Sequence, residues 1–565
     1  MKRLLFLSAW ILILCFTVRG DAQAPPMLTV VNMGPQGEIA SLDEANEIRI
    51  VFSEPMVTLG RIPARPEAPF VRISPAIPGS FRWSGTTILI FTPDPKQPLP
   101  FATTYEVTVE TSATAVSGRK LAKPVTFRFT TPTVRLLRTQ WYRRGGTVDG
   151  RMVLLLRFNQ PVNGSSIAAA LKAAHEPHEW TPPAFTPEAL ARLNAIDAAS
   201  LERFNAKVQA TRAVASSNAP VPLQLTNDWD KKRFPESPDF VAFETTAVIA
   251  PESQIKLTLG AGVRSPAGPA TPGRTQEYTF RAEPAFFVNG FWCTSQCDAD
   301  ARNPIRMRAP VRVGDFATSI AVADITSGDT AVEKTETPRR SEDQLDYGWG
   351  LVLEDAGYAS QPPDRRYAVT LAPDMKSADG QTLGYRWVGI VENWHMRAFT
   401  SFGDGEGVWE KDGGAQLPFY ARNLADVTQW AAPIRPQDLM PLLRRLRDKR
   451  FHESPSEAGS PRKLGGAADR ILSHGLDLSN ALRDGSGLVW AAIREGETIP
   501  RSRRFGDDTN RVKSSIVQIT NLGITVKDSP QNTLIFVTRL DNGAPVPGAR
   551  VSIVRTDNTT FWSGS

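Results

Sequence analysis

A short apolar strand that stops at a proline occurs three times in this chain, and this repeat constrains its fold more than any other feature. The copies lie at residues 48–56, 153–162 and, more faintly, 305–311. Proline has no backbone N–H to donate to a sheet, so it suits the end or the edge of a strand. Each copy therefore predicts a strand near the start of a repeated β module.

A second, strictly alternating pattern follows each copy, and alternation at every second residue is typical of a half-buried strand. It occurs at residues 105–109, 255–259 and 367–371. Each is followed by a turn-rich stretch and an expected closing strand. The three closing strands are expected at residues 125–129, 278–281 and 396–399. The pattern as a whole predicts three β-sandwich modules in series.

The second copy has about 40 more residues between its two patterns than the other copies have. The excess falls where the sequence becomes helical. Thr186 and Pro187 suit the N-cap and first turn of a helix. Apolar residues follow at helical spacing, namely Leu190, Leu193, Leu201, Phe204 and Val208. We expect a helical insertion over about residues 165–235.

The pattern changes after residue 402. Residues 403–407 form a turn-rich linker. Leu439, Leu442, Leu443 and Leu446 then have the spacing of an amphipathic helix. Alternation resumes at residues 516–519, and two apolar runs flank the turn at residues 541–543. The chain ends two or three strands into this last module, whereas a sandwich needs about seven, so we expect a chain that is cut short.

The N-terminus predicts export. Lys2 and Arg3 precede the apolar residues 4–18, and small residues follow, which is typical of a signal peptide cleaved after Ala22. An uncleaved membrane anchor is the alternative, but this run is shorter than the ~20 residues that span a bilayer. We expect a protein of a bacterial periplasm or cell surface, with no transmembrane segment after cleavage.

Residues that could carry catalysis are scarce. Residues 175–179 superficially resemble a zinc protease helix, but His175 and His178 are spaced i, i+3 around a proline, whereas the motif needs i, i+4. A polar loop is the better interpretation. The sequence contains neither a Gly-x-Ser-x-Gly elbow nor a phosphate-binding Gly-Lys-Ser/Thr loop. We therefore predict no catalytic residue, no metal, no cofactor and no enzyme activity.

Cys293 and Cys297 are the cysteines that remain after the signal peptide. Because disulfides persist in exported proteins, we expect a local bridge between them. Cys293 and Gln296 also have the spacing of an internal thioester. The glutamate that precedes the glutamine in such sites is missing, so this alternative is disfavoured.

The strongest basic run lies on the expected leucine-rich helix. It comprises Arg444, Arg445, Arg447, Lys449 and Arg450. A solvated helix face is the simplest interpretation, and export removes nucleic acid as a partner. The aromatic residues within 286–292 predict core or inter-module packing.

Two later segments resemble a known family. Residues 402–410 and 417–424 resemble an early region of bacterial alpha-2-macroglobulin family proteins, and residues 537–551 resemble the start of a macroglobulin-like domain. The repeats before residue 400 resemble bacterial Ig-like modules. In this family, arrays of β-sandwich domains carry a bait segment whose cleavage triggers entrapment of a protease. Many members add a Cys-x-Glu-Gln thioester, which this chain lacks.

The resemblance implies the N-terminal part of a protease inhibitor, a scaffold arm without bait or thioester. Proteases would be the targets of the full-length protein, with other envelope proteins as further partners. The alternative is a secreted Ig-like binding or spacer module with an adhesive or structural role. We expect a mainly β serial array of Ig-like and macroglobulin-like β-sandwich domains with a helical insertion. Its expected divisions are a signal peptide at 1–22, Ig-like domains at 25–133, 134–284 and 285–402, a macroglobulin-like domain at 403–526, and the start of another at 527–565.

Overall fold

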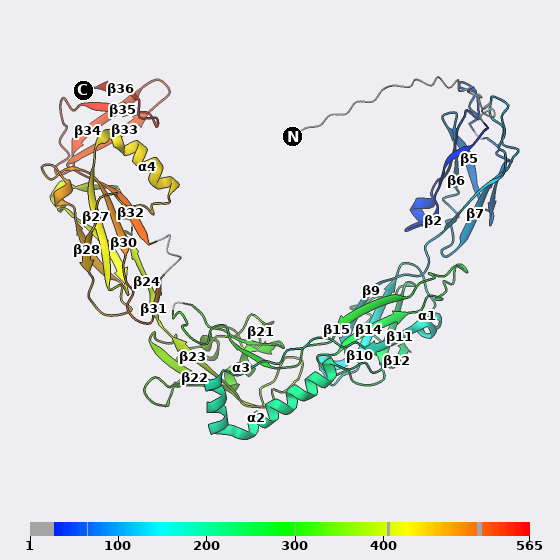
Figure 1. The fold of residues 1–565 in the computed structure, drawn as a ribbon, viewed down its shortest axis with the longest axis horizontal. Coiled ribbons are helices and arrows are strands. Elements are labelled where there is room, and N and C mark those ends of the chain that lie inside the picture. Colours follow the sequence, from blue (N-terminus) through cyan, green and yellow to red (C-terminus); the bar gives the residue numbers. More distant parts are fainter. Residues whose placement is uncertain (1–26, 65, 300, 404–406, 505–510) are drawn as a thin grey trace, which may run out of the picture. The chain divides into compact units, whose positions relative to one another are not determined.

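The computed structural model describes residues 27–64, 66–299, 301–403, 407–504 and 511–565. The expected signal peptide and residues 404–406 of the expected linker lie outside them. The chain is mainly β, and small sheets follow one another along the sequence (Figure 1), which confirms the expected fold class. It divides into two compact units. Unit 1 holds the residues up to His178 and 215–282, and unit 2 holds 179–214 and 283–565.

The first module of unit 1 packs two four-stranded sheets against each other. One has the order β1 (Val30–Gly34), β3 (Ile48–Phe52), β6 (Ile88–Pro93), β5 (Gly79–Ser84), with the short helix η1 (Leu42–Ala45) between β2 and β3. The other has the order β2 (Gly37–Glu38), β8 (Val125–Thr130), β7 (Thr104–Val109), β4 (Val71–Ser74). Ile48, Ile50 and Phe52 alternate into the core, as the pattern predicted.

The second module repeats this arrangement. One sheet has the order β12 (Leu223–Thr226), β13 (Phe240–Thr245), β10 (Met152–Phe158), β9 (Leu136–Arg143), and the other has β11 (Leu171–His175), β14 (Gln254–Leu259), β15 (Gln276–Arg281). The short helices η2 (Arg144–Gly146) and α1 (Gly164–Ala170) complete it. Asn163 caps α1 by accepting hydrogen bonds from the backbone N–H groups of Ser165 and Ser166.

The helical insertion is narrower than expected. The long helix α2 (Pro187–Ala215) is present, and Thr186 Oγ1 accepts a hydrogen bond from the Ala189 N–H at its start. The expected range of 165–235 also covers β11 and β12, which pair with β14 and β13 within the module. Those strands belong to the repeat itself, so the prediction was too broad at both ends. The residues that leave unit 1 are 179–214.

The third module lies in unit 2 and has the sheet order β20 (Thr330–Ala331), β19 (Ile320–Asp324), β22 (Arg365–Leu371), β23 (Trp387–Asn393). Two smaller sheets accompany it, β16 (Val288–Phe291) with β17 (Ile305–Met307), and β18 (Val311–Arg312) with β21 (Leu345–Asp346). The helices are α3 (Val313–Ser319) and η3 (Leu353–Ala356).

The expected closing strand of this third module was wrong. β22 pairs along its length with β23, whereas residues 396–399 lie in β24 (His395–Ser401) and pair with strands of the next module. β23 is a nearly continuous apolar run that is buried on both faces, so the alternating pattern passed over it and selected residues 396–399 instead. The pairing favours a boundary near residue 394 in place of 402.

The fourth module packs a four-stranded sheet against a five-stranded one. The first has the order β29 (Leu472–Asp477), β26 (Gln416–Arg422), β24, β31 (Ser502–Arg504). The second has the order β25 (Gly407–Glu410), β32 (Val512–Thr520), β30 (Gly487–Glu495), β27 (Asp426–Ile434), β28 (Ser460–Lys463). The expected leucine-rich helix is α4 (Leu439–Asp448), and the single turns are η4 (Lys411–Gly413), η5 (Pro436–Asp438) and η6 (Ser479–Ala481).

Two hairpins follow, β33 (Leu522–Asp528) with β34 (Thr533–Arg539) and β35 (Val551–Val554) with β36 (Thr560–Gly564). Among the described residues, none of the helices is both long enough and apolar enough to cross a membrane.

Candidate functional site

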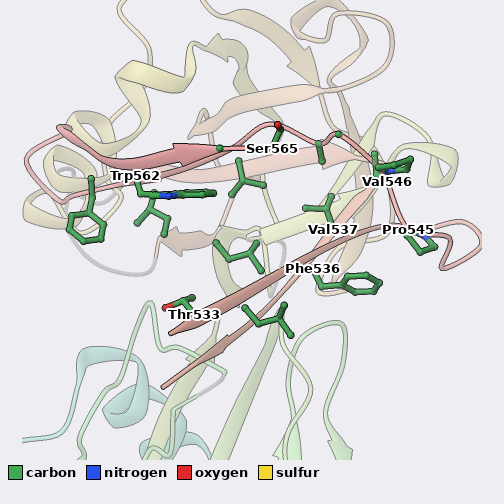
Figure 2. A pocket seen from close by; sticks show the side chains of 16 residues that line it. Thr533, Phe536, Val537, Pro545, Val546, Trp562 and Ser565 are labelled. Atoms are coloured by element: carbon green, nitrogen blue, oxygen red, sulfur yellow. The ribbon is translucent and has the colours of Figure 1, made fainter. Parts of the chain in front are cut away.

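An apolar groove of about 690 Å³ lies between the two last hairpins (Figure 2). Phe536 and Val537 of β34 line it, and Trp562 of β36 lines it from the other hairpin. Trp562 pairs across its sheet with Ile553, so these two side chains share one face. Trp562 remains 47% exposed. The groove therefore presents apolar side chains of two small sheets to solvent.

One edge of β34 is partly covered by the loop that follows it. The Val546 N–H donates to the Val537 carbonyl oxygen at 3.1 Å, and the Arg539 N–H donates to the Ala544 carbonyl oxygen at 2.9 Å. Every second residue of a strand directs both its backbone groups to the same edge, so the backbone of Ile535 faces that edge beyond the loop. This geometry can bury apolar side chains and pair with an extended segment. Its lining includes the hydroxyl residues Thr533 and Ser565 but none of the side chains of His, Cys, Asp, Glu or Lys.

The expected disulfide residues lie beside the third module's sheet. Cys293 and Cys297 are joined in the structure, with their Cα atoms 5.6 Å apart. Cys297 is fully buried. Its backbone N–H donates to the carbonyl oxygen of Glu392 in β23, and its carbonyl oxygen accepts a hydrogen bond from the N–H of Trp394, just after that strand. The bridge therefore fastens a loop to the end of a core strand, and its formation in solution stays a prediction.

The two histidines of the superficial zinc motif lie in separate surroundings. His175 ends β11, and burial lowers its pKa. The side chain of His178 is 5% exposed and lies 3.8 Å from the Glu252 carboxylate. Within the described residues, no group of three or more His, Cys, Asp and Glu side chains is arranged to hold a metal ion.

Arg444, Arg445 and Arg447 are exposed on α4 while Leu446 is buried, and Lys449 and Arg450 follow the end of the helix. Arg445 stacks over the Trp490 ring at 5.1 Å and pairs with Glu453 at 3.3 Å. The run is thus partly engaged with its own module.

Comparison with known proteins identifies one region of the chain. Residues 22–131 match the family model of the bacterial Ig-like domain. No curated protein matches the chain. Among solved structures, native alpha-2-macroglobulin from Escherichia coli spanning domains MG0-NIE-MG1 is 17% identical, with a TM-score of 0.31 and coverage of 50% of this chain and 87% of that one.

Two further structures align over most of the chain. The native conformation of Escherichia coli alpha-2-macroglobulin is 10% identical, with a TM-score of 0.19, covering 95% of this chain and 39% of that one. The S-layer protein rSbsC(31-844) is also 10% identical, with a TM-score of 0.14, covering 95% of this chain and 63% of that one. Superpositions at these TM-scores establish no common arrangement, so they carry no argument about function.

Sequence reasoning missed one notable side chain. Lys207 of α2 donates to the carbonyl oxygens of Thr382 and Leu383, each at 2.9 Å, and lies over the Phe287 ring at 5.1 Å. Burial lowers the pKa of Lys207 to about 8. The available signal was a lysine on the apolar side of an amphipathic helix, because Lys207 follows Phe204 by three residues and so shares its face.

Proposed function

We propose that this chain is the scaffold arm of a bacterial alpha-2-macroglobulin-like endopeptidase inhibitor. The observation that carries the proposal is the sequence resemblance of residues 402–424 and 537–551 to that family, in a serial array of β-sandwich modules. The proposed domains are those expected from the sequence, with the third ending near residue 394. The proposed location is the periplasm or surface of a bacterium, after export.

The resembling residues support a scaffold role because they build a core. Leu417, Phe419 and Ala421 of β26 alternate into the interior of the fourth module. β26 lies between β24 and β29 and pairs with both. A side chain in such a position fixes how the module folds. We assign no catalytic role to this region, and we propose that the chain is not an enzyme.

The rival proposal is a secreted Ig-like binding or spacer module. The match of residues 22–131 to the bacterial Ig-like domain favours it, since modules of this architecture serve many unrelated functions.

Inhibition by entrapment has a signature that separates the two proposals. The protein is isolated at the length at which its host makes it and is incubated with an endopeptidase. Cleavage of a large protein and of a short chromogenic peptide is then measured. A trap protects the large substrate and leaves the peptide accessible, because enclosure acts by size.

The matched control is the 565-residue chain alone, which we expect to protect neither substrate, because the proposal gives it the role of a scaffold arm without a bait segment. If the isolated host protein also protects neither substrate from any endopeptidase class, the inhibitor proposal is wrong and the Ig-like binding module is favoured.

A further inference from the structure

Residues 179–214, which we call the strap, leave unit 1 and return to it at one point. The His178 N–H donates to the Ala215 carbonyl oxygen at 2.9 Å, immediately outside the strap. One step further in, the His175 N–H donates to the Ala219 carbonyl oxygen at 2.8 Å. Because the two ends of the strap are held together by these hydrogen bonds, the module can accommodate an insertion of this length between neighbouring strands. Within the described residues, the strands of the second module pair with one another and not with the strap.

The strap packs onto the third module through two apolar patches. In the first, Phe204 lies with its ring centroid 5.0 Å from that of Tyr385 and 6.1 Å from that of Phe287. In the second, Ala189 and Leu193 cluster with residues of β23. Tyr385 and Phe287 are fully buried. The strap therefore supplies part of the third module's core.

Polar contacts fasten the strap between these patches. α2 is interrupted at Asp197, whose carboxylate accepts hydrogen bonds from the Ser200 N–H and Oγ. Ser200 Oγ in turn accepts the Arg386 N–H at 2.9 Å. Nearer the start of the helix, Arg192 donates to both carboxylate oxygens of Asp329 at 2.8 Å. Ion pairs with solvent-exposed partners contribute little stability each.

Lys207 places a cation inside the docked surface. Its Nζ atom donates hydrogen bonds to two carbonyl oxygens of the third module. It also lies over the rings of Phe286 and Phe287. Lys207 is half-buried, and a partly buried ammonium loses some solvation that such contacts restore only in part. An apolar side chain of similar size at this position would bind the third module more tightly. The lysine therefore weakens the docking of the strap.

We propose that the strap is a releasable fastening, which docks on the third module and can detach while the sheets of unit 1 stay intact. Three features carry this inference, namely the hydrogen bonds that close its ends, its two separate apolar patches and its half-buried lysine. Detachment exposes Phe287 and Tyr385 to solvent. It also removes from the core of the third module the apolar side chains that the strap contributes. The inference stands independently of the proposed inhibitor function.

Because of Lys207, the strength with which the strap docks should depend on pH. Its pKa is about 8 when docked, against 10.5 as the ordinary value, so the detached strap binds the proton more tightly. Docking therefore strengthens as pH rises, by about tenfold between pH 7 and pH 9. Two neighbouring groups keep their protonation states between pH 7 and pH 9. Tyr385 stays protonated because burial raises its pKa, and Arg308 stays cationic as arginine does in this range.

Hydrogen exchange read by mass spectrometry on the whole chain tests the proposal. At pH 7 we expect amides of residues 198–214 to exchange by an opening that leaves β10, β11, β13 and β14 protected. After correction for intrinsic exchange rates, the opening constant should fall about tenfold at pH 9. Simultaneous loss of protection in the strap and in those four strands would overturn the proposal.

Two variants separate release from general unfolding. Phe204→Ala should raise the opening constant of the strap roughly 100-fold through the cavity it leaves, with β10 and β13 unaffected. Lys207→Met should abolish the pH dependence, and its matched control, Gln209→Met on the exposed side of the same helix, should retain it. A pH dependence that survives Lys207→Met contradicts the role assigned to the lysine.

Discussion

His395 Nδ1 lies 2.8 Å from the Oδ2 atom of Asp469. His395 opens β24, the first strand after the third module, and Asp469 lies in the loop before β29. Asn423 completes the contact, since its Nδ2 donates to Asp469 Oδ1 at 2.8 Å while its Oδ1 accepts the Asp469 N–H at 2.7 Å. These bonds tie the entry of the fourth module to its interior loops.

Replacement of Asp469 by asparagine should destabilise the fourth module by about 2–3 kcal/mol. Burial acts to raise the pKa of Asp469, but hydrogen bonds from His395, Asn423 and the Met396 backbone hold it below its usual value. The stabilisation is therefore present above the ordinary aspartate pKa and is lost as pH falls through the lowered one. Urea unfolding measured from pH 7 to pH 3 checks this. Asp448→Asn, on the exposed end of α4, should change little.

Glu495 should show the opposite pH dependence. Burial raises its pKa, although Thr400 donates to its carboxylate from both its N–H, at 2.8 Å, and its hydroxyl. A raised folded-state pKa means that stability falls as pH rises above 4.5 toward that value. Glu495→Gln keeps the hydrogen-bond acceptor and removes the charge. The variant should match the wild type near pH 4 and exceed it at pH 7, and a stability loss at pH 7 would show that the ionised form is needed.

A matched leucine pair tests how the strap docks. Leu193 is fully buried and Leu190, one turn earlier, is 38% exposed. Leu193→Ala should cost about 2–4 kcal/mol in the unfolding of unit 2, and Leu190→Ala less than about 1 kcal/mol. Thermal unfolding followed by circular dichroism measures both. Equal effects would mean that the helix does not pack through the face assigned to it.

The bridge between Cys293 and Cys297 should form in the exported protein and contribute modestly. An intact mass lower than that of the reduced chain by the mass of two hydrogens would identify it. Its closed loop is so short that the entropic model gives about 2 kcal/mol. Replacing both cysteines with serine should lower the stability of unit 2 by no more than that. A loss several times larger would show that the buried Cys297 side chain matters beyond the bond.

Periodicity predicted the strands that lie within repeated patterns. Residues 48–52, 105–109 and 255–259 all form strands, because alternation records which face of a sheet is buried. It missed β23, because a strand that is buried on both faces reads as a continuous apolar run and not as an alternation. The choice between them is made by pairing with β22, a contact between residues far apart in sequence.

The surface against which α2 packs could not be predicted from the sequence, because it too depends on contacts between distant residues. The spacing of Leu193, Phe204 and Val208 predicted a helix with an apolar side. Nothing local specifies which surface covers that side. The answer, a module that begins about 70 residues later, depends on the fold of residues 283–394. The groove between the last hairpins likewise arises from two separate sheets.

The closed ends of the strap have a consequence for a protein exposed to proteases. A cut anywhere within residues 179–214 leaves β9, β10 and β11 on one fragment and β12 to β15 on the other. The two fragments still share both sheets, because β10 pairs with β13 and β11 with β14, each over five residues. A nicked molecule would therefore stay in one piece under native conditions and come apart only in denaturant.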